Sequence, residues 1–274
     1  MTFTVAFIGY GEVGQLFGKQ LAAQQGVAVR AHDVLFDDAA KGSALKAIAA
    51  ETGVAVCGSH VEACREASLV ISAVTADRAV DAARQCANAL TPDQIYVDLN
   101  SISPTTKGQV ADALQRDAAG FVEFAVMAPV AGPGIAVPIL AGGAKAKIVA
   151  EMLNPLGMKI DAVAEKIGVA SATKLCRSIV IKGMEAIMVD LKAATEATGV
   201  WPAVLASLTA SYPGMDWAKI IDYMPPRVKR HGIRRAAEMR EAGKMLDEAG
   251  ANGDFARAIA DAHERYARAN VKQG

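Results

Sequence analysis

The sequence predicts an α/β fold in which a doubly wound, mostly parallel sheet is followed by an all-helical domain. Between residues 3 and 164, short apolar runs alternate with helical patterns of about a dozen residues, which is typical of a parallel sheet covered by helices. After residue 200 the alternation stops and only helical periodicity remains. A proline-free stretch at residues 172–197 predicts one long helix joining the two parts. We therefore expect two domains, residues 1–167 and 168–274.

Each strand of the expected sheet is a short apolar run bounded by turn-forming or polar residues. The strands are expected at residues 3–8, 27–31, 54–57, 69–75, 94–99, 121–127, 139–142 and 159–164. Helical spacing of apolar residues predicts helices that start near residue 13 and at residues 43–52, 61–66, 78–90 and 105–115. Ligands of such sheets bind beyond the carboxyl ends of the strands, so Thr75, Asn100 and Ser101 are expected to face the crevice.

The second domain is expected to begin with the long helix, entered through a turn at Gly168 with Ser171 as the candidate N-cap. Apolar residues lie on nearly every side of this helix between Leu175 and Leu191, which predicts burial on several sides. Further helices are expected at residues 203–208, 217–223, 233–247 and 254–269.

The strongest functional signal lies at the end of the first predicted strand, where the sequence reads Gly9-Tyr10-Gly11-Glu12-Val13-Gly14. Gly9 permits a tight turn, Gly11 lets a pyrophosphate approach the backbone, and Gly14 lets the following helix pack on the strand. Asp33 ends the second strand, where a carboxylate binds ribose hydroxyls. The combination predicts a dinucleotide-binding Rossmann domain. The expected cofactor contacts are Gly9, Tyr10, Gly11, Glu12, Val13, Gly14, Asp33 and Thr75.

The residues after Asp33 indicate which dinucleotide is preferred. Val34, Leu35 and Phe36 follow directly, and none of them is an arginine. A 2′-phosphate would therefore meet a carboxylate and no cationic partner. We expect NAD in preference to NADP.

The composition excludes several functional classes. Lys plus Arg and Asp plus Glu each total 29, so no net charge would attract nucleic acid or an anionic membrane. The four cysteines form no CxxC pair and the four histidines show no metal-binding spacing, so neither a disulfide framework nor a metal site is expected. The first apolar run is too short for a signal peptide or a membrane span, which favours a cytoplasmic protein.

Two polar features of the second domain each allow two interpretations. Lys174 opens an otherwise apolar helix, with Arg177 and Ser178 close to it on the helix surface. It is either a snorkelling stem with a hydrated tip, which these residues alone favour, or a catalytic amine. The basic run at residues 227–235 is either a solvated helix entry or a clamp for a phosphate or carboxylate.

Five stretches together resemble the β-hydroxyacid dehydrogenase family, the relatives of 3-hydroxyisobutyrate and 6-phosphogluconate dehydrogenases. They are VAFIGYGEVG at residues 5–14, DLNSISP at 98–104, APVAG at 128–132, GVASATK at 168–174 and HGIRRAAEM at 231–239. The last stretch is similar to the branch described as phosphogluconate-dehydrogenase-like and NAD-binding. Order and spacing match over almost the whole chain.

The resemblance implies a Rossmann domain, an all-helical second domain that pairs in a homodimer, and a substrate cleft between the domains. It also implies that Lys174 is the general acid/base and that Asn100, Ser101 and Gly132 contact the substrate. Several family positions differ here: Asn100, Ala131 and Pro133 replace two serines and a glycine of the family's motifs, and two further changes concern candidate contacts. Ser178, preceded by Arg177, replaces the usual asparagine, and both are kept as candidate substrate contacts. Arg234 or Arg235 stands for the lysine that meets the cofactor.

The function expected from residues and resemblance is an NAD(P)-dependent oxidoreductase that interconverts an alcohol and its carbonyl compound. The substrate is expected to be a small molecule, either β-hydroxyacid-like or aryl-substituted. One alternative is an imine reductase on the same scaffold, against which Lys174 argues. The other is a non-catalytic protein that senses dinucleotides, which the missing asparagine leaves open.

Overall fold

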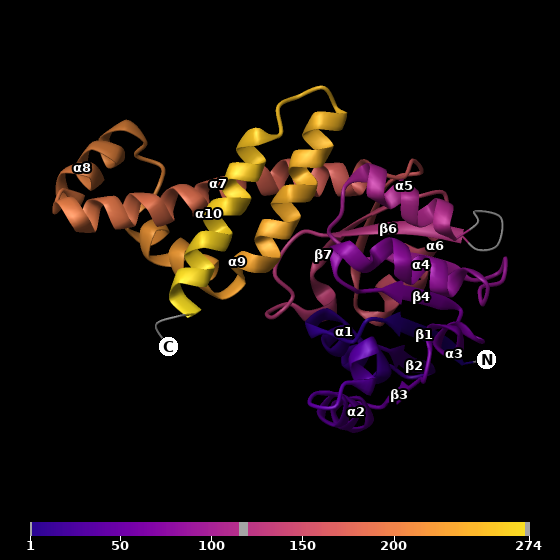
Figure 1. Cartoon of the computed structure of the whole chain (residues 1–274). Coiled ribbons are helices and arrows are strands. Elements are labelled where there is room, and N and C mark those ends of the chain that lie inside the picture. Colours follow the sequence, from indigo (N-terminus) through magenta and orange to yellow (C-terminus); the bar gives the residue numbers. More distant parts are fainter. Residues whose placement is uncertain (1, 115–119, 272–274) are drawn as a thin grey trace. The chain divides into compact units, whose positions relative to one another are not determined.

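The computed structural model describes residues 2–114 and 120–271 of the chain (Figure 1). The chain forms two compact units, Met1–Lys174 and Leu175–Gly274. The first unit holds the sheet and its helices, and the described part of the second is built from helices. The division falls inside the long helix α7 (Val169–Thr198), so the first turns of this helix belong to the first unit and the rest to the second.

Within the described residues, the first unit is built on one eight-stranded sheet with the order β3-β2-β1-β4-β5-β6-β7-β8. The strands are β1 (Phe3–Ile8), β2 (Val27–His32), β3 (Val54–Val56), β4 (Leu69–Ser72), β5 (Ile95–Asp98), β6 (Gly120–Val126), β7 (Pro138–Gly142) and β8 (Lys159–Ala164). Neighbouring strands are parallel except β6 and β7, which are antiparallel. The strand order reverses between β1 and β4, which confirms the doubly wound, mostly parallel sheet predicted from the sequence.

Helices cover the sheet, and alternate residues of β1 enter different cores. Val5 and Phe7 pack in one hydrophobic cluster, while Ala6 and Ile8 pack in another. Both faces of the strand are therefore buried, which explains its unbroken apolar run. The helices are α1 (Glu12–Ala22), α2 (Gly42–Glu51), α3 (His60–Cys64), α4 (Ala79–Ala87), α5 (Pro104–Ala113) and α6 (Ala146–Leu153), with 3₁₀ helices η1 (Val34–Asp37), η2 (Ala76–Arg78), η3 (Gly134–Ala136) and η4 (Asn154–Leu156).

Serine caps move two helix starts from their predicted positions. The helix expected at 61–66 begins at His60, because the Ser59 hydroxyl accepts a hydrogen bond from the Glu62 N–H at 3.1 Å. The helix expected at 105–115 begins at Pro104, and the Ser103 hydroxyl accepts from the Thr106 N–H at 3.2 Å. The last residue predicted for that helix, 115, lies outside the described residues.

The second unit continues α7 with α8 (Trp201–Ser211), α9 (Trp217–Glu248) and α10 (Asp254–Val271). The two helices predicted at 217–223 and 233–247 were wrong: they are one helix with Pro225 and Pro226 inside it. Packing overrides the local preference of proline to end a helix. Figure 1 shows α9 and α10 side by side, and a Cβ atom on Gly232 would lie 2.5 Å from the His263 carbonyl oxygen.

None of the helices formed by residues 2–114 and 120–271 combines the length and the apolar character needed to cross a bilayer.

Candidate functional site

The three glycines of the turn after β1 occupy different environments. A Cβ atom on Gly9, whose φ is +95°, would lie 2.6 Å from the Ala73 carbonyl oxygen, and one on Gly14 would lie 2.4 Å from the Gly9 carbonyl oxygen. Gly11 has nothing within 4 Å of that position. Two glycines are thus required by the protein's own backbone, while the third leaves open space above the turn. Gly11 is also the N-cap of α1 and offers no side-chain cap, so the first-turn N–H groups can receive an anion.

The Asp33 carboxylate joins this turn to the loop after β2. One oxygen accepts a hydrogen bond from the Tyr10 N–H at 2.6 Å, and the other accepts from the Leu35 N–H at 2.8 Å. The acid is therefore held beside the glycine-rich turn, where a ribose would follow the pyrophosphate. The Tyr10 ring is fully buried against Phe36, so only its backbone faces the turn.

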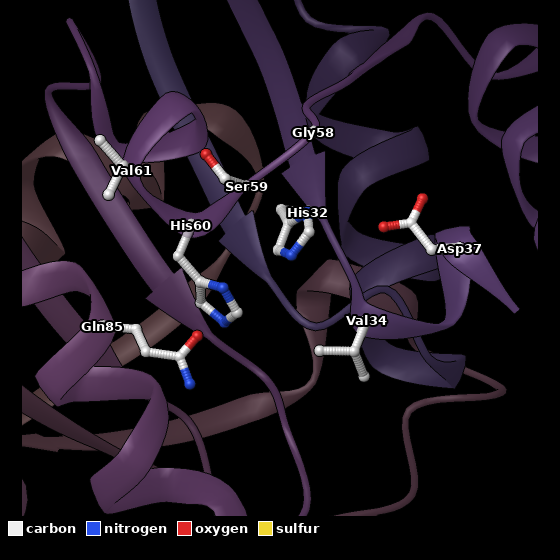
Figure 2. Close-up of a pocket in the computed structure, with 8 residues that line it drawn as sticks. All are labelled: His32, Val34, Asp37, Gly58, Ser59, His60, Val61 and Gln85. Carbon is white, nitrogen blue, oxygen red and sulfur yellow. The ribbon is translucent and has the colours of Figure 1, made fainter.

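A pocket of about 420 Å³ opens beyond Asp33 at the carboxyl ends of β2 and β3 (Figure 2). Figure 2 shows the imidazoles of His32 and His60 side by side, with Gln85 next to His60. The two ring centroids are 4.6 Å apart, and His32 donates through Nδ1 to the Cys57 carbonyl at 3.0 Å. Burial and the neighbouring His32 lower the pKa of His60, which keeps that ring uncharged at neutral pH. The pocket is lined by His32, Val34, Asp37, Gly58, Ser59, His60, Val61 and Gln85, with no lysine or arginine among these residues.

A second group of polar side chains lies in the loop after β5. The Lys174 ammonium, from the second turn of α7, donates a hydrogen bond to the Ser101 hydroxyl. Asn100 donates to the Ser72 hydroxyl at 3.1 Å and to the Asp98 carboxylate at 2.6 Å. The structure thus brings Ser101 and Lys174 together and fixes Asn100 beside Ser101. Of the other predicted residues, Thr75 lies exposed after β4, and Gly132 lies in the exposed loop after β6.

The fold and these two groups fit a known family. Residues 4–168 match the sequence profile of a family described as the NAD binding domain of 6-phosphogluconate dehydrogenase. The chain belongs to this family. Residues 195–266 match a second family, described as a domain of unknown function, DUF1932. Within the described residues, no group of three or more His, Cys, Asp or Glu side chains is arranged to hold a metal ion.

Three solved structures are similar over almost the whole chain. A conserved hypothetical protein from Sinorhizobium meliloti 1021 is 38% identical, with 96% of this chain and 88% of that chain covered and a TM-score of 0.79. The conserved protein MTH1747, described as of unknown function and structurally similar to 3-hydroxyacid dehydrogenases, is 29% identical over 98% of each chain with a TM-score of 0.76. The 3-hydroxyisobutyrate dehydrogenase of Mycobacterium tuberculosis, solved with L-serine, shares the fold at 21% identity, with coverages of 98% and 94% and a TM-score of 0.77. The chain therefore has an NAD(P)-binding, 3-hydroxyacid dehydrogenase-like scaffold.

Downstream of this 6-phosphogluconate dehydrogenase-type domain, the remaining predicted residues belong to the helical unit. Ser178 is buried, donates to the Glu238 carboxylate at 2.6 Å and accepts from the Lys182 ammonium at 3.1 Å. Arg235 is also buried and forms an ion pair with Glu185. Glu185 binds Arg227 as well, at 3.3 Å. Arg177 and Arg234 are exposed.

Four buried charged residues of the described chain were not found by sequence reasoning: Glu185, whose partners are given above, and Asp98, Lys107 and Glu123. The carboxylate of Asp98 and the ammonium of Lys107 form an ion pair with both side chains fully buried, and Lys107 also donates to the Asp98 carbonyl at 2.8 Å. Glu123 on β6 is fully buried as well and binds the start of α7. Asp98 and Glu123 are each the single charged residue of an apolar strand, which could have marked them in the sequence, whereas Lys107 lies in a helix with other polar residues and carries no such signal.

Proposed function

We propose that this chain is an NAD-dependent oxidoreductase that interconverts an alcohol and its carbonyl compound, with Lys174 as the general acid/base. The observation that carries the proposal is the hydrogen bond from Lys174 to Ser101 on an NAD(P)-binding, 3-hydroxyacid dehydrogenase-like scaffold. A lysine that merely keeps its tip hydrated needs no such partner, whereas an acid/base group must be held in place for proton transfer.

The chain's own residues supply binding and proton transfer. Bound nicotinamide would supply the hydride acceptor or donor. In the oxidative direction, neutral Lys174 takes the proton from the substrate hydroxyl, and in the reductive direction its ammonium returns the proton to the carbonyl oxygen. Ser101 holds the amine, and Asn100, whose side-chain N–H₂ group is held by Ser72 and Asp98, offers its Oδ1 as an acceptor to the substrate hydroxyl. Gly132 is a further proposed substrate contact.

NAD rather than NADP fits the charges beside Asp33. The carboxylate lies where the adenosine ribose would bind, and the adjoining pocket is lined by no lysine or arginine. The lowered pKa of His60 leaves this ring without positive charge at neutral pH. A 2′-phosphate would thus meet the Asp33 charge and gain no cationic partner.

The substrate class follows from the same groups and from the family resemblance. We propose a small β-hydroxyacid-like or aryl-substituted alcohol, because one acid/base group and an adjacent amide suit a hydroxyl beside a second polar group. An imine substrate would not require a general base for a hydroxyl proton. We further propose that the enzyme is cytoplasmic and pairs as a homodimer through residues after Gly168.

The proposal is tested by mixing the purified protein with NAD and a panel of hydroxyacids and aryl-substituted alcohols, following nicotinamide absorbance. We expect turnover of at least one alcohol and its loss in Lys174→Ala. Calorimetric titration with NAD on both proteins provides the control, because the dinucleotide contacts lie on another element. NAD binding without turnover of any panel member would instead support a dinucleotide-sensing protein.

A further inference from the structure

The carboxylate of Glu123 lies at the start of α7 and is completely buried. Oε1 accepts hydrogen bonds from the Gly168 N–H at 2.6 Å and the Ala170 N–H at 3.1 Å, and Oε2 accepts from the Ser171 N–H at 3.3 Å. The first N–H groups of a helix have no partner within the helix. Here a side chain from β6, forty-five or more residues earlier in the chain, provides that partner.

The surrounding residues make room for this carboxylate. Gly142 on β7 is the register partner of Glu123, and a Cβ atom there would lie 2.5 Å from Oε1. Gly168 has a φ of +101°, a conformation that glycine adopts without strain, and directs its N–H to the same oxygen. A buried carboxylate is costly unless it is paired or fully hydrogen-bonded. The aligned N–H groups and the positive end of the helix dipole offset that cost.

Glu123 also connects the two sides of the candidate active site. Its register partner on β5 is Asp98, whose carboxylate holds the Asn100 amide and the Lys107 ammonium. The loop that carries Ser101 is thus held by Asp98 at the end of β5. The first turn of α7 is held by Glu123 on β6. Lys174 follows that first turn directly, so its approach to Ser101 depends on both strands.

We propose that Glu123 is a positioning residue for Lys174: it holds the first turn of α7 on the sheet so that the Lys174 amine meets the Ser101 hydroxyl. This inference rests on the proposed acid/base function of Lys174. Glu123 itself touches no substrate or cofactor, and its effect reaches the reaction through the helix.

Glu123→Gln is the test variant, because it keeps the size of the side chain but places an amide N–H₂ group against a helix N–H. We expect turnover to fall by about 10- to 100-fold, the scale of a misplaced catalytic group. NAD affinity should stay within about twofold of wild type, since Gly9 to Gly14 lie on another element. In a Lys174→Ala background, Glu123→Gln should cause no further loss of turnover, because the residue it positions is gone.

Asn154→Ala is the matched control. Asn154 also binds the backbone of another element, through hydrogen bonds of 3.0 and 2.8 Å to Ile160, but has no link to α7. It should lower stability and leave turnover per folded molecule unchanged. Hydrogen exchange on the substrate-free protein supplies a readout independent of activity. Glu123→Gln should speed amide exchange at residues 168–171, and Asn154→Ala should not.

The outcomes separate the two proposals. If Lys174→Ala keeps wild-type turnover, the acid/base function fails. If Lys174→Ala is inactive while Glu123→Gln keeps full turnover per folded molecule, only the positioning role is overturned. Additive losses in the double variant, or unchanged exchange at residues 168–171, would also overturn it.

Discussion

The Lys174 amine and the Ser101 hydroxyl are hydrogen-bonded across 73 residues of sequence. The amine comes from the second turn of α7 and the hydroxyl from the loop after β5, two segments that are far apart in the sequence. This hydrogen bond supports the proposed role of Lys174 as the acid/base group.

Replacing Lys174 with arginine tests proton transfer directly. The guanidinium keeps the positive charge but cannot serve as a base near neutrality. We expect Lys174→Arg to fold, to bind NAD with unchanged affinity, and to lose about 10²- to 10⁴-fold in oxidative turnover. Ser101→Ala should lose less, because the amine itself remains. More than about a tenth of wild-type turnover in Lys174→Arg would contradict general-base catalysis.

The cofactor preference should respond to residue 34. Val34 is 70% exposed at the mouth of the pocket, so an arginine fits there without repacking. We expect wild type to bind NAD more tightly than NADP, and Val34→Arg to raise NADP affinity by about 10- to 100-fold, the value of one charged hydrogen-bonded pair. Val34→Ala serves as the control. Tighter binding of NADP than NAD by the wild-type protein, measured by calorimetry, would reject the assignment.

The buried Asp98–Lys107 pair predicts a stability effect with a specific remedy. Lys107→Met leaves the Asp98 carboxylate buried without its cation, which costs about 3–5 kcal/mol in the free energy of unfolding. Adding Asp98→Asn removes the uncompensated charge and should restore a large part of this loss. Urea denaturation of wild type, Lys107→Met and the double variant measures both the loss of stability and its recovery. Equal stability of Lys107→Met and the double variant would show that the charge is compensated in another way.

Stability should fall at mildly acidic pH, in part because of His263. This ring is fully buried; Nε2 donates to the Lys182 carbonyl at 3.0 Å, and Nδ1 has no partner among the described residues. Burial lowers its pKa below the ordinary 6.5, with the hydrogen bond to Lys182 opposing the shift. The unfolded chain therefore binds more protons just below pH 6.5, so the free energy of unfolding decreases as pH decreases there.

His263→Gln removes the titrating group and keeps a hydrogen-bond donor. We expect the free energy of unfolding to depend less on pH between 6.5 and about 5 than in wild type. His60, whose pKa is lowered in the same direction, accounts for part of the remaining slope. An unchanged slope in urea titrations would show that His263 does not contribute.

Assembly can be tested on the apolar surface of the helical unit. Its exposed large side chains include Val180, Ile187, Ile233 and Phe255. We expect a homodimer by light scattering at about micromolar concentration, and Ile187→Glu should shift it toward the monomer, because a charge is costly in an apolar contact. Ile148→Glu, an exposed position in the first unit, is the control. A wild-type monomer would contradict the prediction.

The sequence predicted correctly those features that depend on neighbouring residues in the chain, such as the glycine-rich turn and the buried strands. Gly9 and Gly14 lie against backbone atoms, and a strand with two buried faces reads as a continuous apolar run. Pro225 and Pro226 led to the wrong prediction of two helices, because packing of α9 outweighs the local preference of proline to end a helix. Arg235 belongs to a basic run in sequence, yet its partner Glu185 lies 50 residues earlier. The role of Glu123 was equally hidden, because its N–H donors arrive only when α7 docks on β6.

The absence of a side chain at Gly142 restricts which substitutions residues 142 and 123 tolerate together. Because a Cβ atom at 142 would occupy the space of the Glu123 carboxylate, residue 142 cannot gain a side chain while Glu123 is kept. A Gly142→Ala lesion should therefore be rescued in a selection by second-site changes that shorten residue 123. Such revertants would tolerate the lesion while giving up the tie between the sheet and α7.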